Sequence, residues 1–354
     1  MDGFKRNASI DVAKGIGILL VVYAHIVLKN PVLNIIYGFH MPLFFILSGM
    51  VLNTSKYDTF FAFVKRRFWS LLIPYLMFSI PSIALWFFYN LGIAVISNNF
   101  SLQLVKTRLL VSLSQLVNIL HAPYSTVLLN VPLWFVPCLF IVECLFFILY
   151  KSIKNRLLFL IVIVILVALG WFTESDLSPV DFSFLPWNIG SALFALGFFA
   201  IGNLTYKKYT QTVALLRGKA FVMLVAIIVC FAIEVPLAIS NGHVTLGTRI
   251  LNNGFILYTS AIFGSIAILL LSELLKNSKF LQFCGRSSFC IMGSHFIIKI
   301  IVTGFLRDVM RIESAGLKRM LIVFIITLII SLLFSVIYGR LKDHVIRKKS
   351  LNNL

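Results

Sequence analysis

The sequence is short of acidic residues and of charge altogether. Only 12 of its 354 residues are Asp or Glu, against 31 Lys and Arg, and charged residues make up 12% of the chain. A soluble domain is about a quarter charged and about half apolar, whereas this chain is 60% hydrophobic and contains 34 Phe. A soluble fold this apolar would expose large apolar patches to water. The composition therefore excludes a soluble enzyme, a disordered chain and a nucleic-acid-binding module.

Cysteine is also scarce and shows no ligand spacing. All 5 Cys lie inside apolar stretches, and no CxxC pair occurs. We interpret them as small buried hydrophobic residues and expect neither a disulfide framework nor a metal site. The sequence has no P-loop, GxSxG or HExxH motif either, so none of these sites competes with the interpretation below.

Long hydrophobic runs are abundant. A membrane-spanning helix needs about 20 mostly apolar residues. Ten stretches meet this requirement: 10–28, 33–53, 69–90, 132–150, 157–173, 184–204, 219–240, 250–275, 283–306 and 319–338. The sequence therefore predicts an all-α fold, a polytopic membrane helix bundle of about ten transmembrane helices in a multi-pass protein of the cell (plasma) membrane.

Two segments need separate interpretation. Asp11 and Lys14 interrupt the first apolar stretch, and no small-x-small cleavage site follows it, so we predict a retained helix and not a signal peptide. The segment 104–120 is apolar but carries two basic and two amide side chains. We predict that it forms an interfacial or partly inserted helix.

Basic residues are distributed unevenly between the loops. If both termini lie inside, 20 Lys and Arg fall on the inner side and 8 on the outer side, with three left inside helices. This bias predicts cytoplasmic termini. The net charge of +19 is then explained by the orientation of the protein and by contact with anionic membrane lipids, and a polyanionic partner is not needed to account for it. No linker or repeat divides the chain, so we expect one membrane domain, 1–340, followed by a basic cytoplasmic tail, 341–354.

Three ionisable residues share the first span. At about 100° per residue, Asp11, Lys14 and His25 face the same way, and His25 lies roughly 16 Å beyond Lys14 along the helix axis. Ionisable residues inside a membrane are costly and indicate function by default. The alternative is that Lys14 extends to the lipid headgroups and that His25 caps the helix.

The second span contains a histidine close to a proline. His40 lies in Phe39-His40-Met41-Pro42-Leu43-Phe44-Phe45-Ile46-Leu47-Ser48-Gly49. The span returns inward after a short loop, so His40 and His25 are predicted at similar depth on neighbouring helices. Pro42 frees a backbone carbonyl, which in a membrane must find a partner or face a cavity. Ser48 and Gly49 permit close helix approach, so helix packing is an equally good explanation for this end of the motif.

Further polar residues occur at the ends and in the middle of other spans. The cluster Lys65-Arg66-Arg67 precedes the third span, as either a positive-inside anchor or a phosphate clamp. Glu143 and His295 lie mid-span, and we expect both to line a cavity. We expect the remaining histidines at the surface; they are His121, His243 and His344.

These residues together suggest a path across the membrane. A phosphate-rich donor held at the inner face could present its reactive end to His25, because imidazole is suited to general-base work near neutral pH. An acceptor hydroxyl could arrive from the outer side. From the residues alone, a proton-coupled transporter fits almost as well.

Several motifs resemble the membrane-bound acyltransferase 3 family. Asp11-Val12-Ala13-Lys14-Gly15-Ile16, followed by His25, resembles its opening motif, and the Phe39–Gly49 block resembles its second-helix motif. Weaker matches follow in the family's order over nearly the whole chain: the basic cluster before Pro74, Pro132-Leu133-Trp134-Phe135, and Gly285-Arg286-Ser287-Ser288 with His295. The Lys-Gly pair and the His-Met-Pro-Leu-Phe-Phe block resemble particularly the fucose 4-O-acetylase-like branch.

The resemblance implies transfer of an acyl group, usually acetyl from acetyl-CoA, to a hydroxyl of a cell-surface or lipid-linked glycan. It also implies that His25 is the catalytic histidine and that Lys14 helps to hold the acyl-CoA donor. Family members commonly carry Arg at the position of Lys14. Lys keeps the charge but not the two-pronged geometry of a guanidinium.

We therefore expect an integral-membrane O-acyltransferase that uses no metal. His25 is expected to act as base, and His40, Glu143 or His295 to orient it or to position substrate. The expected donor-binding residues are Lys14, Arg66, Arg67 and Arg286, and the expected substrate contacts are Asp11, Ser48 and Trp134. Direct transfer and a covalent relay through Ser48 or His25 both fit. The alternatives are a proton-coupled transporter or flippase-like component of a polysaccharide pathway, and a non-catalytic assembly partner.

Overall fold

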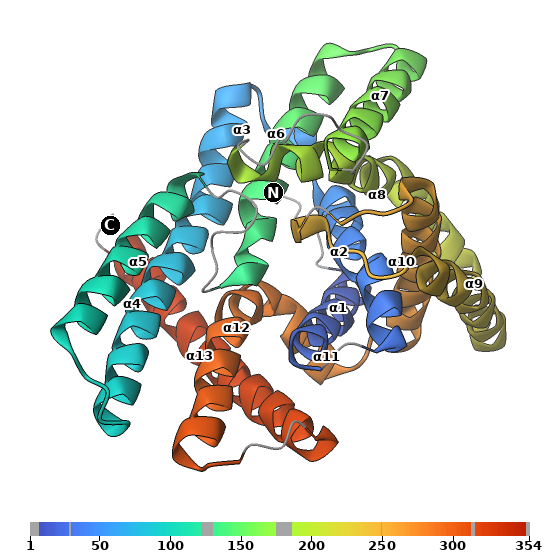
Figure 1. The fold of residues 1–354 in the computed structure, drawn as a ribbon. Helices are drawn as coiled ribbons and strands as arrows, with labels where there is room; N and C mark the ends of the chain where they lie inside the picture. Colours follow the sequence, from blue (N-terminus) through green and yellow to red (C-terminus); the bar gives the residue numbers. More distant parts are fainter. Residues whose placement is uncertain are drawn as a thin grey trace.

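The protein is a bundle of long helices (Figure 1). A computed structural model describes residues 7–27, 30–121, 130–174, 186–248, 250–312 and 316–351. Within these ranges, ten helical segments are long and apolar enough to cross a membrane, and the β-type pairing is an isolated bridge between Thr245 and Ile250. The predicted fold class, a polytopic all-α membrane bundle, is confirmed.

The spans are formed by α1 (Ala8–Ile26), α2 (Pro31–Val51), α3 (Phe60–Arg67) with α4 (Ile73–Ile96), α6 (Phe135–Ser152), α7 (Arg156–Glu174), α8 (Ile189–Leu215), α9 (Ala220–Asn241), α10 (Gly254–Leu274), α12 (Ser288–Gly304) and α13 (Leu317–Leu351). Two further helices are α5 (Leu102–His121) and α11 (Lys279–Arg286). Asparagine side chains accept backbone N–H groups at the starts of several helices, such as Asn7 at α1 and Asn30 at α2. These caps satisfy donors that the first turn of a helix leaves unpaired.

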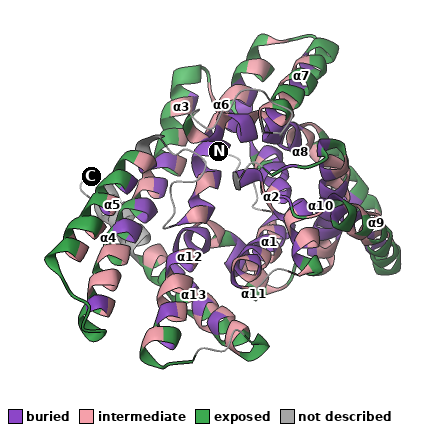
Figure 2. Cartoon of the chain, in the orientation of Figure 1, coloured by how far each residue is buried: buried purple, intermediate pink, exposed green. Residues whose placement is uncertain are grey.

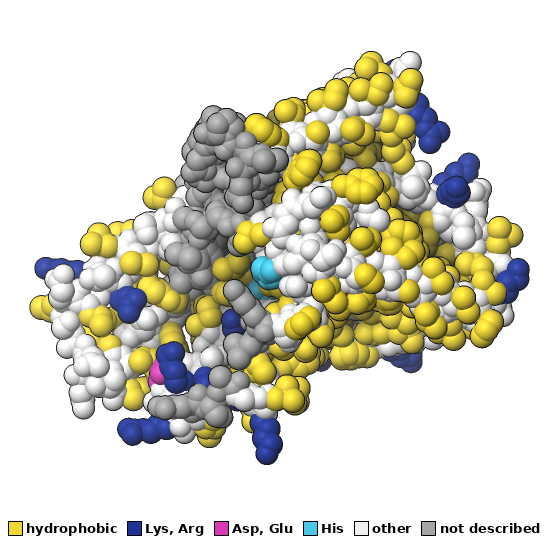
Figure 3. Space-filling view, turned by 45° about the vertical axis from the view of Figure 1, so that its right-hand side comes forward, with side chains coloured by type: hydrophobic (Ala, Val, Ile, Leu, Met, Phe, Trp, Pro, Cys, Tyr) yellow, Lys and Arg dark blue, Asp and Glu magenta, His cyan; other side chains and the backbone are white. Residues whose placement is uncertain are grey.

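The helices form an inner group and an outer group. In α1, α2, α6, α8, α10 and α12 between 56% and 67% of the spanning residues are buried, whereas the share is 17% to 33% in the α3–α4 segment, α7, α9 and α13 (Figure 2). Hydrophobic side chains cover much of the surface, with Lys and Arg towards its margins (Figure 3). Lipid accepts such apolar faces, so a polar site has to lie between the inner helices.

The third predicted span is shorter than the helix that contains it. It was expected at 69–90, but the helix runs from Phe60 to Ile96 and contains a π-helical turn at Phe68–Leu72. The last span, expected at 319–338, matches the apolar segment Leu317–Arg340, although the helix α13 continues to Leu351. The helix therefore passes through the predicted boundary at 340, and the division into membrane domain and tail stays a prediction.

The ninth predicted span is not one helix. The apolar run 283–306 is broken at Ser287, between the short α11 and α12. The short α11 lies directly on α1 through two glycines. The backbone of Gly285 packs on the Asp11 carbonyl, and Gly15 packs on the Leu281 carbonyl. A run of apolar residues carries no signal of such a contact.

The segment predicted at 104–120 is helical and lies along α4. The Tyr75 hydroxyl donates to the Ile119 carbonyl at 3.1 Å, and the Arg108 guanidinium lies over the Trp86 ring at 5.2 Å. Higher numbers in α5 therefore meet lower numbers in α4, so the two helices are antiparallel and side by side (Figure 1). Whether α5 is interfacial or partly inserted stays a prediction.

The two ends of the bundle are named here by the first two helices. The start of α1 and the end of α2 form the inner end, and the end of α1 and the start of α2 form the outer end. The assignment of the inner end to the cytoplasm stays a prediction from the basic residues.

Candidate active site

A cavity of about 460 Å³ lies between α1, α2, α6 and α12. On α1 it is lined from Lys14 to His25, and on α2 from Tyr37 to Ser48 and Val51. The rise of about 1.5 Å per residue makes the α1 wall roughly 16 Å long between Lys14 and His25. The cavity therefore connects the inner end of the bundle with the outer end.

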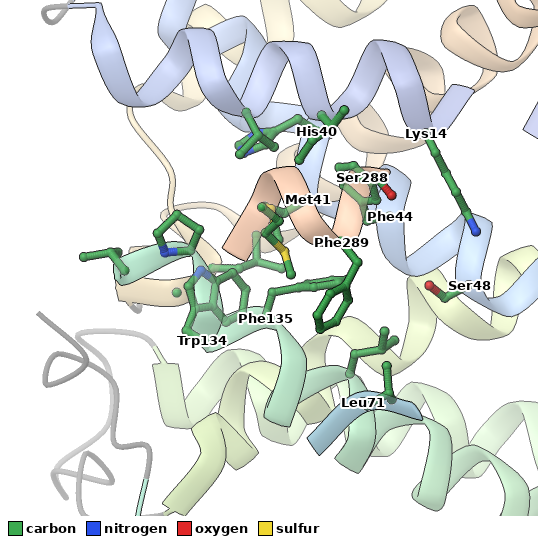
Figure 4. A pocket seen from close by; sticks show the side chains of 18 of the residues that line it. Lys14, His40, Met41, Phe44, Ser48, Leu71, Trp134, Phe135, Ser288 and Phe289 are labelled. Carbon is green, nitrogen blue, oxygen red and sulfur yellow. The ribbon is translucent and has the colours of Figure 1, made fainter. Parts of the chain in front are cut away.

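The middle of the cavity is apolar and aromatic. Lys14 and Ser48 lie at one end, Trp134 lies at the opposite end, and Phe44, Phe135 and Phe289 lie between them (Figure 4). Aliphatic and thioether side chains complete this middle section; they are Ile18, Val21, Met41, Leu139 and Met292. A polar or charged ligand group is thus favoured at either end, and an extended, largely apolar chain in between.

Three histidines of the bundle share one hydrogen-bonding arrangement. The distance from Nδ1 to the carbonyl oxygen four residues earlier is 2.8 Å from His25 to Val21, 2.7 Å in His40 and 2.9 Å in His295. A carbonyl oxygen only accepts, so Nδ1 carries the proton, and the neutral ring keeps its lone pair on Nε2. Each ring therefore offers a base on the side that faces away from its own helix.

The structure brings all three histidines to the outer end. His25 and His40 line the cavity, and the His295 ring lies 5.3 Å from the His25 ring by centroids. His295 is fully buried, and its Nε2 has no hydrogen-bond partner within the described residues. His295 does not line the cavity itself, so its influence on the cavity passes through His25.

A buried ion pair lies near the inner end. Arg67 Nε and Glu143 Oε2 are 2.9 Å apart, both residues line the cavity, and the Glu143 side chain is 4% exposed. Arg67 is the last residue of α3 and directly precedes the π-helical turn. The sequence identified both residues but not their pairing.

The other predicted site residues divide between the cavity and the surface. Lys14, Ser48 and Trp134 line the cavity. Trp134 packs on Gly247, where any added Cβ would meet the indole ring. Asp11 is buried next to α11 and does not line this cavity.

Two predicted phosphate-binding residues lie elsewhere. Arg66 and Arg286 are exposed, and neither lines the cavity. The Arg286 guanidinium donates to the Gln282 side chain at 3.4 Å, within α11. The structure therefore does not bring Arg66 and Arg286 together with Lys14.

Asn130 is a site residue that the sequence interpretation missed. It is fully buried, and its Nδ2 donates to Ser82 Oγ at 3.0 Å and to the Gly293 carbonyl at 2.6 Å. These bonds fasten the start of the 3-10 turn Val131–Trp134 to α4 and to α12, two residues from His295. The only available signal was an amide side chain directly before an apolar run.

Tyr37 was also missed. Its ring lies 5.0 Å from His40 and 4.8 Å from His243, and it lines the outer end of the cavity. His243 is exposed, as expected. The side chains of His121 and His344 lie outside the described residues.

Cysteines and possible metal ligands add no further site. Four of the five cysteines are buried and Cys144 is half-buried, and all five are free. Among the described residues, no group of three or more His, Cys, Asp or Glu side chains is placed to hold a metal ion.

The sequence profile of the acyltransferase 3 family, described as an acyltransferase domain, matches residues 7–340. The chain belongs to the acyltransferase 3 family. The resemblance stated from its motifs is confirmed at this level, and the protein is a multi-pass membrane acyltransferase. No curated protein and no solved structure matches the chain closely enough to add to this assignment.

The two ends of the cavity differ in chemistry. The imidazoles of His25 and His40 lie at the outer end, and the ammonium group of Lys14 lies at the inner end. The cavity thus has proton acceptors at one end and a positive charge at the other.

Proposed function

We propose that the protein is an O-acyltransferase of the fucose 4-O-acetylase-like kind, which moves an acetyl group from acetyl-CoA, or another acyl group from its acyl-CoA, to a hydroxyl of a cell-surface or lipid-linked glycan. The acyl-CoA binds from the cytoplasmic side, and the glycan arrives at the outer end. The observation that carries this proposal is the single cavity with Lys14 at its inner end and His25 at its outer end. Its apolar middle is suited to the uncharged pantetheine arm, which joins the thioester of an acyl-CoA to the nucleotide.

In this proposal His25 is the general base. Its Nδ1–H is bonded to the Val21 carbonyl, so Nε2 accepts the proton of the acceptor hydroxyl. The hydroxyl oxygen forms a bond to the thioester carbonyl carbon while the carbon–sulfur bond breaks. The proton then passes from His25 to the departing thiolate, which leaves as free CoA thiol. Atoms and charge balance without a metal or a redox step.

Neighbouring residues would orient this base. His295 packs against the His25 ring, and His40 lines the same end of the cavity, so both are candidates for positioning His25 or the glycan. Glu143 lies at the other end and holds Arg67, so we assign it to the donor side. Trp134 at the outer end is suited to pack on a sugar face.

The position of Ser48 favours direct transfer. Ser48 and Lys14 lie together at the inner end (Figure 4), whereas His25 is roughly 16 Å further along. An acyl group carried on Ser48 would still have to cross the apolar middle of the cavity. Direct attack on the thioester, or a short relay through His25, requires no such movement.

A proton-coupled transporter or flippase-like protein remains the alternative. A proton relay needs polar groups in succession. Here the stretch between the ion pair and His25 is lined within the described residues mainly by apolar side chains such as Val21, Met41 and Phe44. This apolar interval supports acyl transfer over proton transport.

The decisive experiment replaces the proposed base. His25→Ala removes general-base catalysis, which typically contributes about 10²- to 10⁴-fold, so we expect ester groups to disappear from surface glycans while protein levels stay normal. Mass spectrometry of glycans from cells with and without the gene provides the measurement. Lys154→Ala, which changes an exposed residue between α6 and α7 outside the cavity, is the control and is expected to keep the esters.

Other outcomes separate the alternatives. Persistence of the esters in His25→Ala cells would contradict the enzymatic role of His25. Loss of the glycan itself from the surface of cells that lack the gene would support transport, whereas normal export of an unmodified glycan would exclude it.

A further inference from the structure

A second cavity opens at the inner end of the bundle. It measures about 590 Å³ and lies between the start of α1, the end of α2 with the following turn η1 (Thr54–Lys56), the end of α6 and α8. Lys14 and Val51 line both this cavity and the cavity of the candidate active site. The two cavities therefore lie next to each other and share these two residues.

The lining of the second cavity differs in kind from that of the first. It contains amide and hydroxyl side chains, the two lysines Lys14 and Lys56, and the aromatic rings of Tyr150 and Tyr206. Among the described residues, the wall contains one carboxylate, that of Asp11, which is 5% exposed, whereas Lys56 is exposed. The accessible charge that these residues contribute is therefore positive.

Hydrogen bonds hold the wall of this cavity in place. Asn203 of α8 donates through Nδ2 to the carbonyls of Gly49 at 2.9 Å and Leu52 at 3.0 Å, which closes the last turn of α2. The Asn53 side chain accepts the Ser55 backbone N–H at 2.9 Å and so shapes the turn that presents Lys56. The site is thus preorganised before a ligand binds.

We infer that this second cavity holds the nucleotide end of the acyl-CoA donor. The phosphates lie between Lys56 and Lys14, since ammonium groups bind phosphate oxygens through charge-assisted hydrogen bonds. The adenine packs on Tyr206, because aromatic rings stack on nucleobases. The pantetheine arm then passes Val51 into the first cavity. This inference rests on the proposed function and assigns to Lys56 and Tyr206 the role that the sequence gave to Arg66 and Arg286.

The test compares two donors that differ only in the nucleotide end. Acetyl-CoA carries the phosphates and adenine, whereas acetyl-pantetheine lacks them. Purified full-length protein in vesicles of neutral phosphatidylcholine is titrated with each donor, and the dissociation constant is measured by calorimetry. Lys56→Gln and Tyr206→Leu are expected to weaken acetyl-CoA binding about tenfold, which is the effect of one lost charge-assisted or stacking contact. They are expected to leave acetyl-pantetheine binding unchanged.

Matched variants control for general damage. Lys56→Arg keeps the charge and Tyr206→Phe keeps the ring, so both are expected to bind acetyl-CoA nearly as the wild type does. Lys207→Gln removes an exposed lysine next to Tyr206 that does not line the cavity, and it is expected to change nothing.

Several results would overturn the inference. They are equal binding of both donors by the wild type, equal weakening of both donors in Lys56→Gln, and binding of acetyl-CoA that is unaffected by both substitutions. An effect of the substitutions that appears only in vesicles containing anionic lipid would show that the cavity holds a lipid headgroup instead. Because binding is the measurement, absence of acyl transfer in the wild type would contradict the proposed function without deciding this site.

Discussion

At the scale of single residues, the sequence predicted several residues of the cavity correctly, but it did not predict which of them form pairs. Periodicity placed Lys14 and His25 on one face of one helix, and both line the same cavity. The hairpin of the first two spans put His40 near His25, and both line the outer end. The pairing of Arg67 with Glu143 was not predictable, because it depends on which helices are neighbours, and hydropathy carries no information on that order.

The Arg67–Glu143 pair leads to a stability prediction. Removing one partner of a buried ion pair leaves an uncompensated charge and costs about 3–5 kcal/mol. Arg67 is 21% exposed, so water offsets part of this cost, and we expect Glu143→Ala to lose about 2 kcal/mol. The double variant Arg67→Met/Glu143→Leu removes both charges and is expected to recover most of that loss. Thermal unfolding of the purified variants in detergent measures both effects.

The comparison of single and double variants identifies the cause of the stability loss. If the double variant melts at as low a temperature as Glu143→Ala alone, the loss of stability comes from lost packing and not from an unpaired buried charge. Glu143→Gln keeps the shape of the side chain and serves as the conservative control.

At the scale of helices, length and composition located the spans but not their interruptions. The number and order of the spans and their apolar centres follow from hydropathy. The π-helical turn at Phe68–Leu72 and the break at Ser287 do not follow from hydropathy, although local signals accompany both. Pro74 follows the turn, and Gly285, Ser287 and Ser288 surround the break, and Gly and Ser are poorer helix formers than Ala or Leu. The contact of α11 with α1 is not visible in a single sequence.

The contact between α11 and α1 gives a prediction for two glycines. A Cβ at Gly285 would collide with the Asp11 carbonyl, whereas a Cβ at Gly92 in α4 has no neighbouring atom within 4 Å. We expect Gly285→Ala to destabilise the protein by about 1–3 kcal/mol, the range for overpacking. We expect Gly92→Ala to be neutral or to stabilise by about 0.5–1 kcal/mol, because Ala favours the helix.

Melting temperatures of the two alanine variants, measured side by side, test this contrast. Equal melting temperatures would mean that α11 can move away from α1 at no cost. A lower melting temperature for Gly285→Ala alone would show that the close contact of α11 with α1 stabilises the protein.

At the scale of the whole molecule, the bundle separates helices that build the site from helices that face lipid. The sequence predicted the number of spans and the family, and through the family the motif residues. It did not predict that α9 and α13 lie outside and that α8 and α10 lie inside. Mean hydropathy carried part of this division, since it is 2.8 in α9 and 3.1 in α13 against 1.5 in α8 and 2.1 in α10, but the length and composition of a span do not give its neighbours. Burial in a membrane protein depends on packing between helices, which hydrophobicity does not drive in lipid.

The predicted orientation can be tested by labelling. Lys154, between α6 and α7, and Asn99, between α4 and α5, are both exposed and are predicted on opposite sides of the membrane. A membrane-impermeant maleimide added outside intact cells is expected to label Asn99→Cys and not Lys154→Cys. The native background is expected to be low, because four native cysteines are buried and burial raises the pKa of the Cys284 thiol to about 11.

Labelling after cell lysis provides the control, since both variants should then react. The reverse pattern in intact cells would place the inner end outside, and the acyl-CoA donor proposed here could not reach it.

The aromatic middle of the cavity has an electrical consequence. Phe44, Phe135 and Phe289 lie between the charged inner end and the histidines of the outer end. A narrow apolar constriction repels water and therefore ions. In the proposed function, an acyl group is then transferred across the bilayer while ions do not leak through the cavity, so the membrane potential is kept.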